Sequence, residues 1–190
     1  QFERWCANRA VGLVVMEACG SAHHWARWLN GLGVEVRMLP APYVRAYVKR
    51  NKTDAADAAA ICEAVQRPNM RFVPVKSEDQ QSRLMVHRAR QGFVAARTAC
   101  LNRIRGLLSE FGHVLPLKAE VVRASAREHL EELPGYANMV IGDLLSEVSH
   151  LDERIKQYDK HIRTMAKDCT AAQQLMQLMG VGETTATAIV

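Results

Sequence analysis

Two short apolar runs separated by a helical stretch set the strongest limit on the fold. Residues 11–16 and 34–39 are rich in β-branched side chains, and the first run lacks polar alternation, which is typical of a strand buried on both faces. Between the runs, Ser21 can cap a helix that ends near two glycines. Residues 70–75 form a further extended piece. Strands that alternate with helices predict an α/β layer with a mostly parallel sheet.

Three acidic residues stand where such a sheet places its site. Glu17 follows the first strand, at the edge where parallel sheets bind ligands. Asp54 and Asp57 lie on one face of a helix that Thr53 caps and that extends through Val65, after the basic residues 49–52. Two carboxylates in a first helical turn either lie in water, stabilised by the helix dipole, or hold a divalent cation. The third acid favours the cation.

From Ser77 onward, the sequence pattern is typical of long helices and is rich in basic residues. A capping box at residues 77–80 opens a helix that we expect to reach Phe111, with one apolar stripe. Residues 80–109 hold no acid and six arginines: Arg83, Arg88, Arg90, Arg97, Arg103 and Arg105. A solvated face is the usual explanation of a charge run, but such a face mixes signs. Phosphate contact is the alternative, because guanidinium forks suit phosphate oxygens.

A second long helix follows Pro134 and carries a heptad pattern. Its apolar positions alternate spacings of four and three: Leu144, Val148, Leu151, Ile155, Tyr158, Ile162 and Met165. We expect i,i+4 ion pairs of Asp152 with Lys156 and of Asp159 with Arg163 on the outside. The seam can pack on the first long helix as a hairpin, or on its copy in another subunit as a homo-oligomer. Residues 117–132 give no clear pattern.

The C-terminal stretch places a turn between two helices. One helix is expected to end at Gly180 and another to start near Glu183. Gly180 and Gly182 can expose backbone N–H groups to a phosphate, although the turn is also a common helix stop.

Composition limits the class of protein. The net charge of +5 is a mild nucleic-acid signal, and the 48% apolar content with only 6% aromatic residues favours helix. Five scattered cysteines without a C-x-x-C pair indicate a reduced, cytoplasmic protein. No apolar run is long enough for a membrane. Cys19, His23 and His24 fit no standard zinc spacing. Neither Gln1 nor the helical stretch at Val190 resembles a natural chain end, so both ends look cut, and the chain should enter a strand almost at once.

Four blocks together resemble a known family. Residues 15–27, 50–58, 71–76 and 180–188 are similar to motifs of bacterial insertion-sequence transposases that carry a RuvC-like DEDD domain and a separate serine-bearing domain, and that are guided by a bridge RNA. The resemblance covers essentially the whole chain. It implies a partial RuvC-like domain over residues 1–76, a helical coiled-coil region over 77–170, and the start of the helical transposase domain over 171–190.

Residue by residue, the resemblance matches Glu17 to the first E of the DEDD set and Asp54 and Asp57 to its last two acids. It implies Mg²⁺ at these residues, DNA and a guide RNA as partners, and strand exchange that also uses a serine–DNA link. The family's first Asp should precede Gln1 and its serine should follow Val190. No serine of this chain matches that motif. The fragment alone is therefore expected to be inactive.

Two other hypotheses remain open from the sequence. One is a RuvC-type resolvase that cuts DNA without a serine, which would form no covalent protein–DNA adduct. The other is a non-catalytic nucleic-acid-binding helical module whose acids merely cap helices. Mg²⁺ would then give no thermal stabilisation that depends on the three acids.

Overall fold

The two apolar runs pair as parallel strands. The computed structural model describes residues 2–48 and 53–190, and in it β1 (Leu13–Glu17) and β2 (Glu35–Leu39) pair in register, with Glu17 opposite Leu39. α2 (Ala22–Gly31) makes the crossover that parallel strands require. The predicted β–α–β start is confirmed, although the Ser21 side chain makes no cap hydrogen bond.

Side chains of each strand alternate between two small cores. Val15 and Leu39 pack with Ala60 and Ala64 of α4 (Asp54–Val65), while Met38 packs with Ala22 and Ala26 of α2. The short helix α3 (Ala41–Arg45) adds Val44 to the first core. Both faces of the two-stranded sheet are therefore covered by helices, as the absence of polar alternation in the first run predicts.

The extended segment after α4 returns to the sheet. Val73 forms an antiparallel bridge to Met38, with its amide donating to the Met38 carbonyl at 2.8 Å. The Lys76 amide donates to Nδ1 of His23 at 3.1 Å, and Arg27 donates to the Lys76 carbonyl at 2.7 Å. His23 and Arg27 are one turn apart on α2, so this helix holds the segment in place.

A helix precedes the first strand, where the sequence led us to expect a strand almost at once. α1 (Phe2–Ala7) places Phe2 edge-on to Trp25, with ring centroids 5.2 Å apart, and Trp25 in turn lies edge-on to Trp28 at 5.9 Å. Phe2 and Trp25 are more than twenty residues apart in the chain. Local pattern does not reveal it, because a helix this short depends on tertiary packing.

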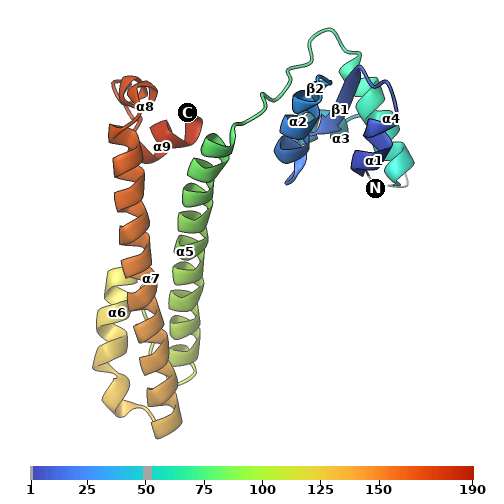
Figure 1. The fold of residues 1–190 in the computed structure, drawn as a ribbon. Helices are drawn as coiled ribbons and strands as arrows, with labels where there is room; N and C mark the ends of the chain where they lie inside the picture. Colours follow the sequence, from blue (N-terminus) through green and yellow to red (C-terminus); the bar gives the residue numbers. More distant parts are fainter. Residues whose placement is uncertain (1, 49–52) are drawn as a thin grey trace. The chain divides into compact units, whose positions relative to one another are not determined.

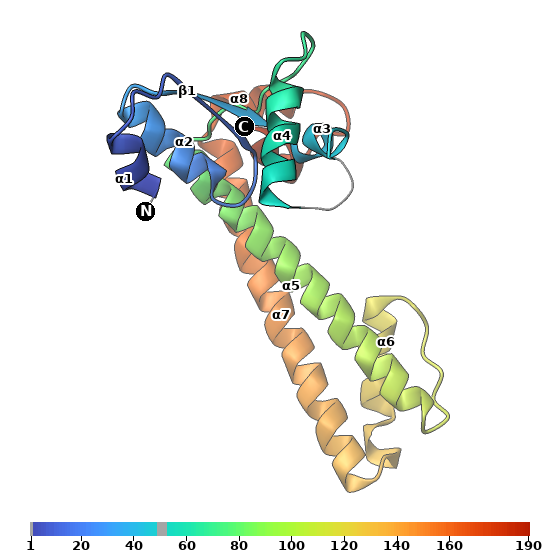
Figure 2. The same cartoon turned by 90° about the vertical axis from the view of Figure 1, so that its right-hand side faces the viewer.

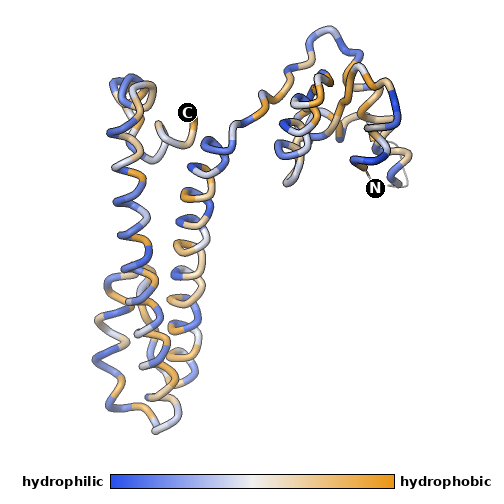
Figure 3. Tube along the Cα trace, viewed as in Figure 1, coloured by the Kyte–Doolittle hydropathy of each residue, from blue (hydrophilic) through white to orange (hydrophobic). Residues whose placement is uncertain are grey.

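Two long helices form a hairpin in the second unit. The chain forms two compact units, Gln1–Asp79 and Gln80–Val190. α5 (Glu78–Ser109) and α7 (Gly135–Lys167) run side by side, and α6 (Ala119–Glu128) and the 3₁₀ turn η1 (Leu130–Glu132) lie at one end (Figures 1 and 2). The hydropathy colouring shows apolar and polar residues alternating along both long helices (Figure 3).

A shared core holds the hairpin together. Ile104 and Leu108 of α5, Val122 of α6 and Val148 of α7 are fully buried in one cluster. The sequence left open whether the seam of α7 packs on α5 or on another subunit, and the structure shows it on α5. Four of the seven seam residues are buried, namely Val148, Leu151, Ile155 and Ile162, and Leu144, Tyr158 and Met165 are half-buried. Two further buried residues of α7, Ile141 and Leu145, belong to the cluster that also contains Val122 and Ala126 of α6.

The predicted ion pairs along α7 are wrong. Asp152 and Asp159 turn toward arginines of other helices, whereas Lys156 pairs with Glu153 at 2.9 Å and Arg163 with Glu183 at 3.6 Å. An i,i+4 pair on a solvated face contributes only a few tenths of a kcal/mol, so a less exposed interhelical partner prevails.

Helix ends differ from expectation in two places. α5 ends at Ser109 rather than Phe111, and α8 (Thr170–Leu175) ends well before Gly180. A series of turns with Gly180 at φ +83° then leads to α9 (Glu183–Ile189), which buries Ala186 and Thr187. In the described residues no helix is long and apolar enough to span a membrane. All five cysteines are free thiols.

The contact between α5 and α9 predicts a pH dependence of stability. Nε2 of His87 lies 3.1 Å from Oγ1 of Thr187. Burial lowers the pKa of His87 below its ordinary 6.5, and the nearby Arg90 charge lowers it further, although a hydrogen bond to the Thr187 backbone opposes the shift. The folded chain then binds fewer protons than the unfolded chain below about pH 6.5. This contribution to stability is complete above that pH and is lost as the pH falls through 6.5. His87→Gln should make the free energy of unfolding depend less on pH, as measured by urea unfolding between pH 7.5 and 5.5. A pH dependence as steep as that of the unchanged chain would contradict this prediction.

Candidate active site

Glu17 is positioned by the pairing of the two strands. It is the last residue of β1, half-buried, and the amide of the next residue, Ala18, donates to the Leu39 carbonyl at 2.8 Å. The strand therefore continues in contact with β2 one residue past Glu17. The carboxylate stands at the carboxyl edge of the sheet, as the sequence predicts.

The paired aspartates occupy the first turn of α4. Oγ1 of Thr53 accepts a hydrogen bond from the Ala56 amide at 3.2 Å, which confirms the predicted cap. Asp54 is exposed and Asp57 is half-buried. Residues 49–52, the basic approach to this helix, lie outside the described residues.

One stripe of α4 connects Asp57 to the sheet. Ala60, Ile61 and Ala64 lie three, four and seven residues after Asp57, and all three belong to the core that α4 forms with Val15 of β1. Ile61 also lines a shallow depression of about 410 Å³ together with Glu17, Cys19 and Trp25. Asp57 thus lies one helical turn from a side chain that shares a depression with Glu17.

The three carboxylates do not meet at a single point. Within residues 2–48 and 53–190, the one group of three metal-ligating side chains with ligand atoms within 4.8 Å of one another lies elsewhere, in the helical unit. Glu17, Asp54 and Asp57 also have no ion pair with any described residue. Their negative charge is therefore not neutralised by the described part of the protein.

The six arginines of α5 point in different directions. Nε of Arg90 lies 2.5 Å from Oδ1 of Asp159, and Nη1 of Arg97 lies 3.0 Å from Oδ1 of Asp152, both on α7. Arg105 donates to the Leu115 carbonyl at 3.4 Å, and Arg83 is half-buried. Arg88 and Arg103 are exposed and make no ion pair with a described residue, so they remain accessible to a phosphate backbone.

Comparison with known proteins decides the family. The family of IS110-type DEDD transposases, described as "Transposase", matches residues 2–113. The chain belongs to this family.

Three relatives carry transposase names. A "Probable family 20 transposase" of Pseudomonas aeruginosa is 41% identical over 182 residues, covering 93% of this chain and 54% of the relative. The transposases for insertion sequence elements IS1328 of Yersinia enterocolitica and IS1111A of Coxiella burnetii are each 36% identical, over 98% and 100% of this chain and 56% and 53% of their own lengths. The chain therefore spans about half the length of these relatives.

In this transposase-family chain the glycine turn near the C-terminus has an acidic neighbour. Gly182 precedes α9 and is exposed, and Glu183 occupies the first turn of that helix. Glu183 already faces Arg163 at 3.6 Å. A carboxylate at this position competes with a phosphate for the same backbone N–H groups.

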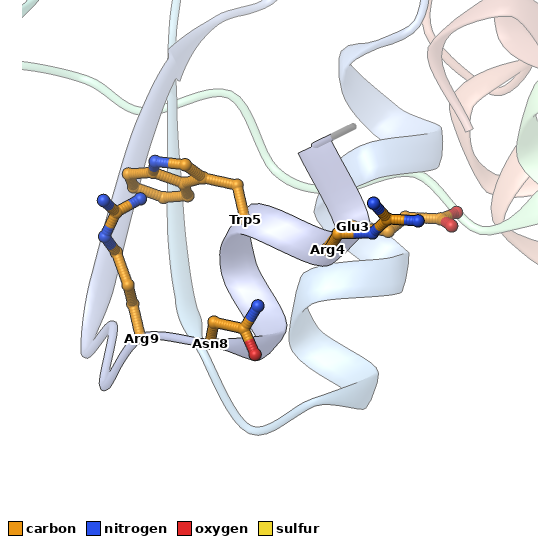
Figure 4. A pocket seen from close by; sticks show the side chains of 5 residues that line it. All are labelled: Glu3, Arg4, Trp5, Asn8 and Arg9. Carbon is orange, nitrogen blue, oxygen red and sulfur yellow. The ribbon is translucent and has the colours of Figure 1, made fainter.

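The structure also shows a surface that the sequence reasoning missed. Glu3, Arg4, Trp5, Asn8 and Arg9 line a concave region of about 580 Å³ at α1, and the Arg9 guanidinium lies over the Trp5 ring at 4.3 Å (Figure 4). Such a pair is a cation–π contact. The aromatic residues near the N-terminus are the signal that marks this surface, and they become meaningful only once α1 is known.

Asp152 allows a test of whether arginines of the helical unit stabilise its fold through ion pairs. Its carboxylate, only 18% exposed, lies 3.0 Å from Arg97 of α5 and 2.9 Å from Arg123 of α6. Asp152→Asn would leave two guanidinium groups facing each other, and we expect a loss of about 2 kcal/mol in the free energy of unfolding in urea. Asp143→Asn, at an exposed position of the same helix, should change it by less than about 0.5 kcal/mol. Equal effects of the two changes would contradict this assignment.

Proposed function

We propose that this chain supplies the acidic, RuvC-like part of the catalytic centre of a DNA transposase, with Glu17, Asp54 and Asp57 as its metal-binding residues. One observation carries the proposal. Glu17 ends a parallel strand, and the stripe of α4 that begins at Asp57 packs against that same strand. This packing supports a placement of Asp57 toward the edge of the sheet that Glu17 occupies, where α/β folds place their sites.

The donor atoms fit a hard divalent cation. All are carboxylate oxygens, which Mg²⁺ prefers, and no described cation neutralises them. Mg²⁺ keeps several of its waters and needs only one or two carboxylates, which suits acids that do not converge on one point. In the same sequence motif, Nδ1 of His23 accepts a hydrogen bond from the Lys76 amide at 3.1 Å, and its Nε2 faces the Lys76 ammonium at 3.3 Å.

The residues of the chain position the metal and the DNA. Mg²⁺ held here would supply electrostatic stabilisation of the phosphodiester oxygens during strand exchange. The Thr53 cap fixes the direction of α4, and the β1–β2 pairing fixes Glu17. The serine that the family resemblance implies for the covalent step would come from outside this chain.

The helical hairpin is proposed to bind nucleic acid through α5. Arg88 and Arg103 are the exposed arginines of that helix, and the residues exposed between them include the small side chains of Gly92, Ala95 and Ala99. A small-residue surface allows a close approach of a phosphate backbone or of a second copy of the chain. DNA and a guide RNA are the proposed partners, and a homo-oligomer through the same helices is compatible with this surface.

A metal-binding role for the three acids predicts a specific loss. Mg²⁺ should raise the melting temperature of this chain, and Asp57→Ala should abolish the rise because the half-buried carboxylate is lost. Glu63→Ala, an exposed acid on the same helix, serves as the matched control and should keep it. In a transposase of the full length of the relatives, Asp57→Ala should also abolish DNA strand exchange, because the metal that stabilises the reacting oxygens would be lost.

The outcomes separate the three hypotheses. A Mg²⁺ effect that survives Asp57→Ala, or strand exchange retained in that variant, rejects the metal site. A protein that cleaves DNA with no covalent protein–DNA adduct indicates the serine-independent resolvase. A chain that binds nucleic acid but shows no Mg²⁺ effect indicates a non-catalytic binding module.

Nucleic-acid binding by α5 is tested through its salt dependence. Replacing Arg88 and Arg103 together by Gln should weaken binding of duplex DNA or structured RNA and lower the slope of log affinity against log salt by up to about two. Lys160→Gln with Lys167→Gln removes the same charge from exposed positions of α7 and should leave the slope closer to that of the unchanged chain. An identical decrease in both double variants would show a general charge effect instead of a site on α5.

A further inference from the structure

A cluster of imidazole and carboxylate groups lies at the end of the hairpin where α6 packs. His113 follows the end of α5, His129 follows α6, and Glu132 ends η1. Their ligand atoms all lie within 4.8 Å of one another. This cluster belongs to the helical unit and shares no residue with the acidic site on the sheet.

The spacing of the three groups matches that of ligands around one metal ion. Oε2 of Glu132 lies 3.2 Å from Nδ1 of His129 and 3.8 Å from Nε2 of His113. In a tetrahedral zinc site with bonds of about 2.0–2.1 Å, ligand atoms lie about 3.4 Å apart. The two rings are stacked, with centroids 4.0 Å apart and planes 25° apart, so one imidazole has to turn out of the stack for both nitrogens to face one ion.

The backbone around the cluster is already fixed. The His113 amide donates to the Leu108 carbonyl at 3.0 Å. The His129 amide donates to the Ser125 carbonyl and the Glu132 amide to the His129 carbonyl, each at 3.2 Å. The nearby carbonyl of Leu130 also accepts a 2.6 Å hydrogen bond from Asn138 of α7. Folding therefore brings the three side chains together before any ion binds, which lowers the entropic cost of forming the site.

We propose that His113, His129 and Glu132 form a binding site for a divalent transition metal, with zinc as the representative ion. Two imidazoles and one carboxylate are a ligand set of zinc sites, and this set disfavours Mg²⁺, which prefers oxygen. The histidines are half-buried and Glu132 is exposed, so an ion can enter from solvent and a water can complete the coordination.

The bound ion has a structural consequence for the hairpin. It links the segment after α5 to the turn before α7, and it closes the loop that contains α6. Val114 and Leu117, which follow His113, are strongly exposed apolar side chains. A metal that fixes His113 restrains the segment that presents them.

The test is a metal titration of this chain without a histidine tag, after treatment with a chelator. Zn²⁺ in a background of excess Mg²⁺ should bind with one equivalent per chain and raise the melting temperature. Co²⁺ should give visible bands of a nitrogen and oxygen site without a thiolate charge-transfer band. A thiolate band would place the metal at the cysteines and overturn the proposal, as would the absence of saturable binding.

Single substitutions locate the site. Glu132→Gln and His113→Ala should each weaken Zn²⁺ binding by more than about tenfold, the lower end of the loss seen when even an outer-shell partner is removed. Glu131→Gln, the adjacent exposed acid, and His150→Ala, an exposed histidine of α7, are the matched controls and should bind as the unchanged chain does. Because Glu132 and Glu131 are both exposed, neither change should disturb folding.

The proposals of the acidic site and of the zinc site can be rejected independently of each other. Asp57→Ala removes the Mg²⁺ effect if the acidic site is correct, and it should leave Zn²⁺ binding unchanged. Equal affinity in Glu132→Gln and Glu131→Gln would reject the zinc site and leave the acidic site unaffected.

Discussion

Pairing of opposite charges between the helices allows the helical unit to close its apolar core beside the basic helix α5. α5 carries no acid between residues 80 and 109, and α7 supplies Asp152 and Asp159 to its arginines. Asp152 also contacts Arg123 of α6, so a single carboxylate joins three helices next to the apolar core. Among the described residues, no hydrogen-bond partner faces the buried Nε atoms of Arg97 and Arg123, which makes these guanidinium groups dependent on that carboxylate. The one-signed charge of α5 is therefore partly a folding signal, and only its exposed arginines remain available to nucleic acid.

Sequence reasoning succeeded where the signal is local. The two strands, the Thr53 cap and the start of α7 each follow from a short pattern, and the structure confirms them. It failed where the decisive contact is distant in the chain. α1 exists because Phe2 packs on Trp25, and the partners of Asp152 come from α5 and α6 rather than from one turn away. The candidate residues Glu17 and Asp57 each come from a local pattern. The core that Val15 of β1 shares with Ile61 of α4 could not be predicted from a local pattern.

The two candidate metal sites differ in the chemistry of their ligands. The acidic site offers oxygen atoms alone, at the edge of a sheet, in the part of the chain that matches the family of IS110-type transposases. The cluster at the end of the hairpin offers two imidazoles and one carboxylate. Hard and borderline cations are sorted by such differences in donor type rather than by affinity alone. The acidic site, if it forms, would therefore favour an oxygen-preferring cation, and the imidazole site a transition metal.

The placement of α9 has a consequence for the order in which the helical unit folds. Thr187 meets His87 across 100 residues of chain, and the Val190 carbonyl accepts a hydrogen bond from Gln80 across 110. At the other end, contacts such as those of His113 with His129 and of Asn138 with Leu130 close short loops. Long loops cost more entropy to close, and a helix of seven residues is not stable by itself. The hairpin should therefore form from the α6 end, with α9 docking last and being the first element to detach.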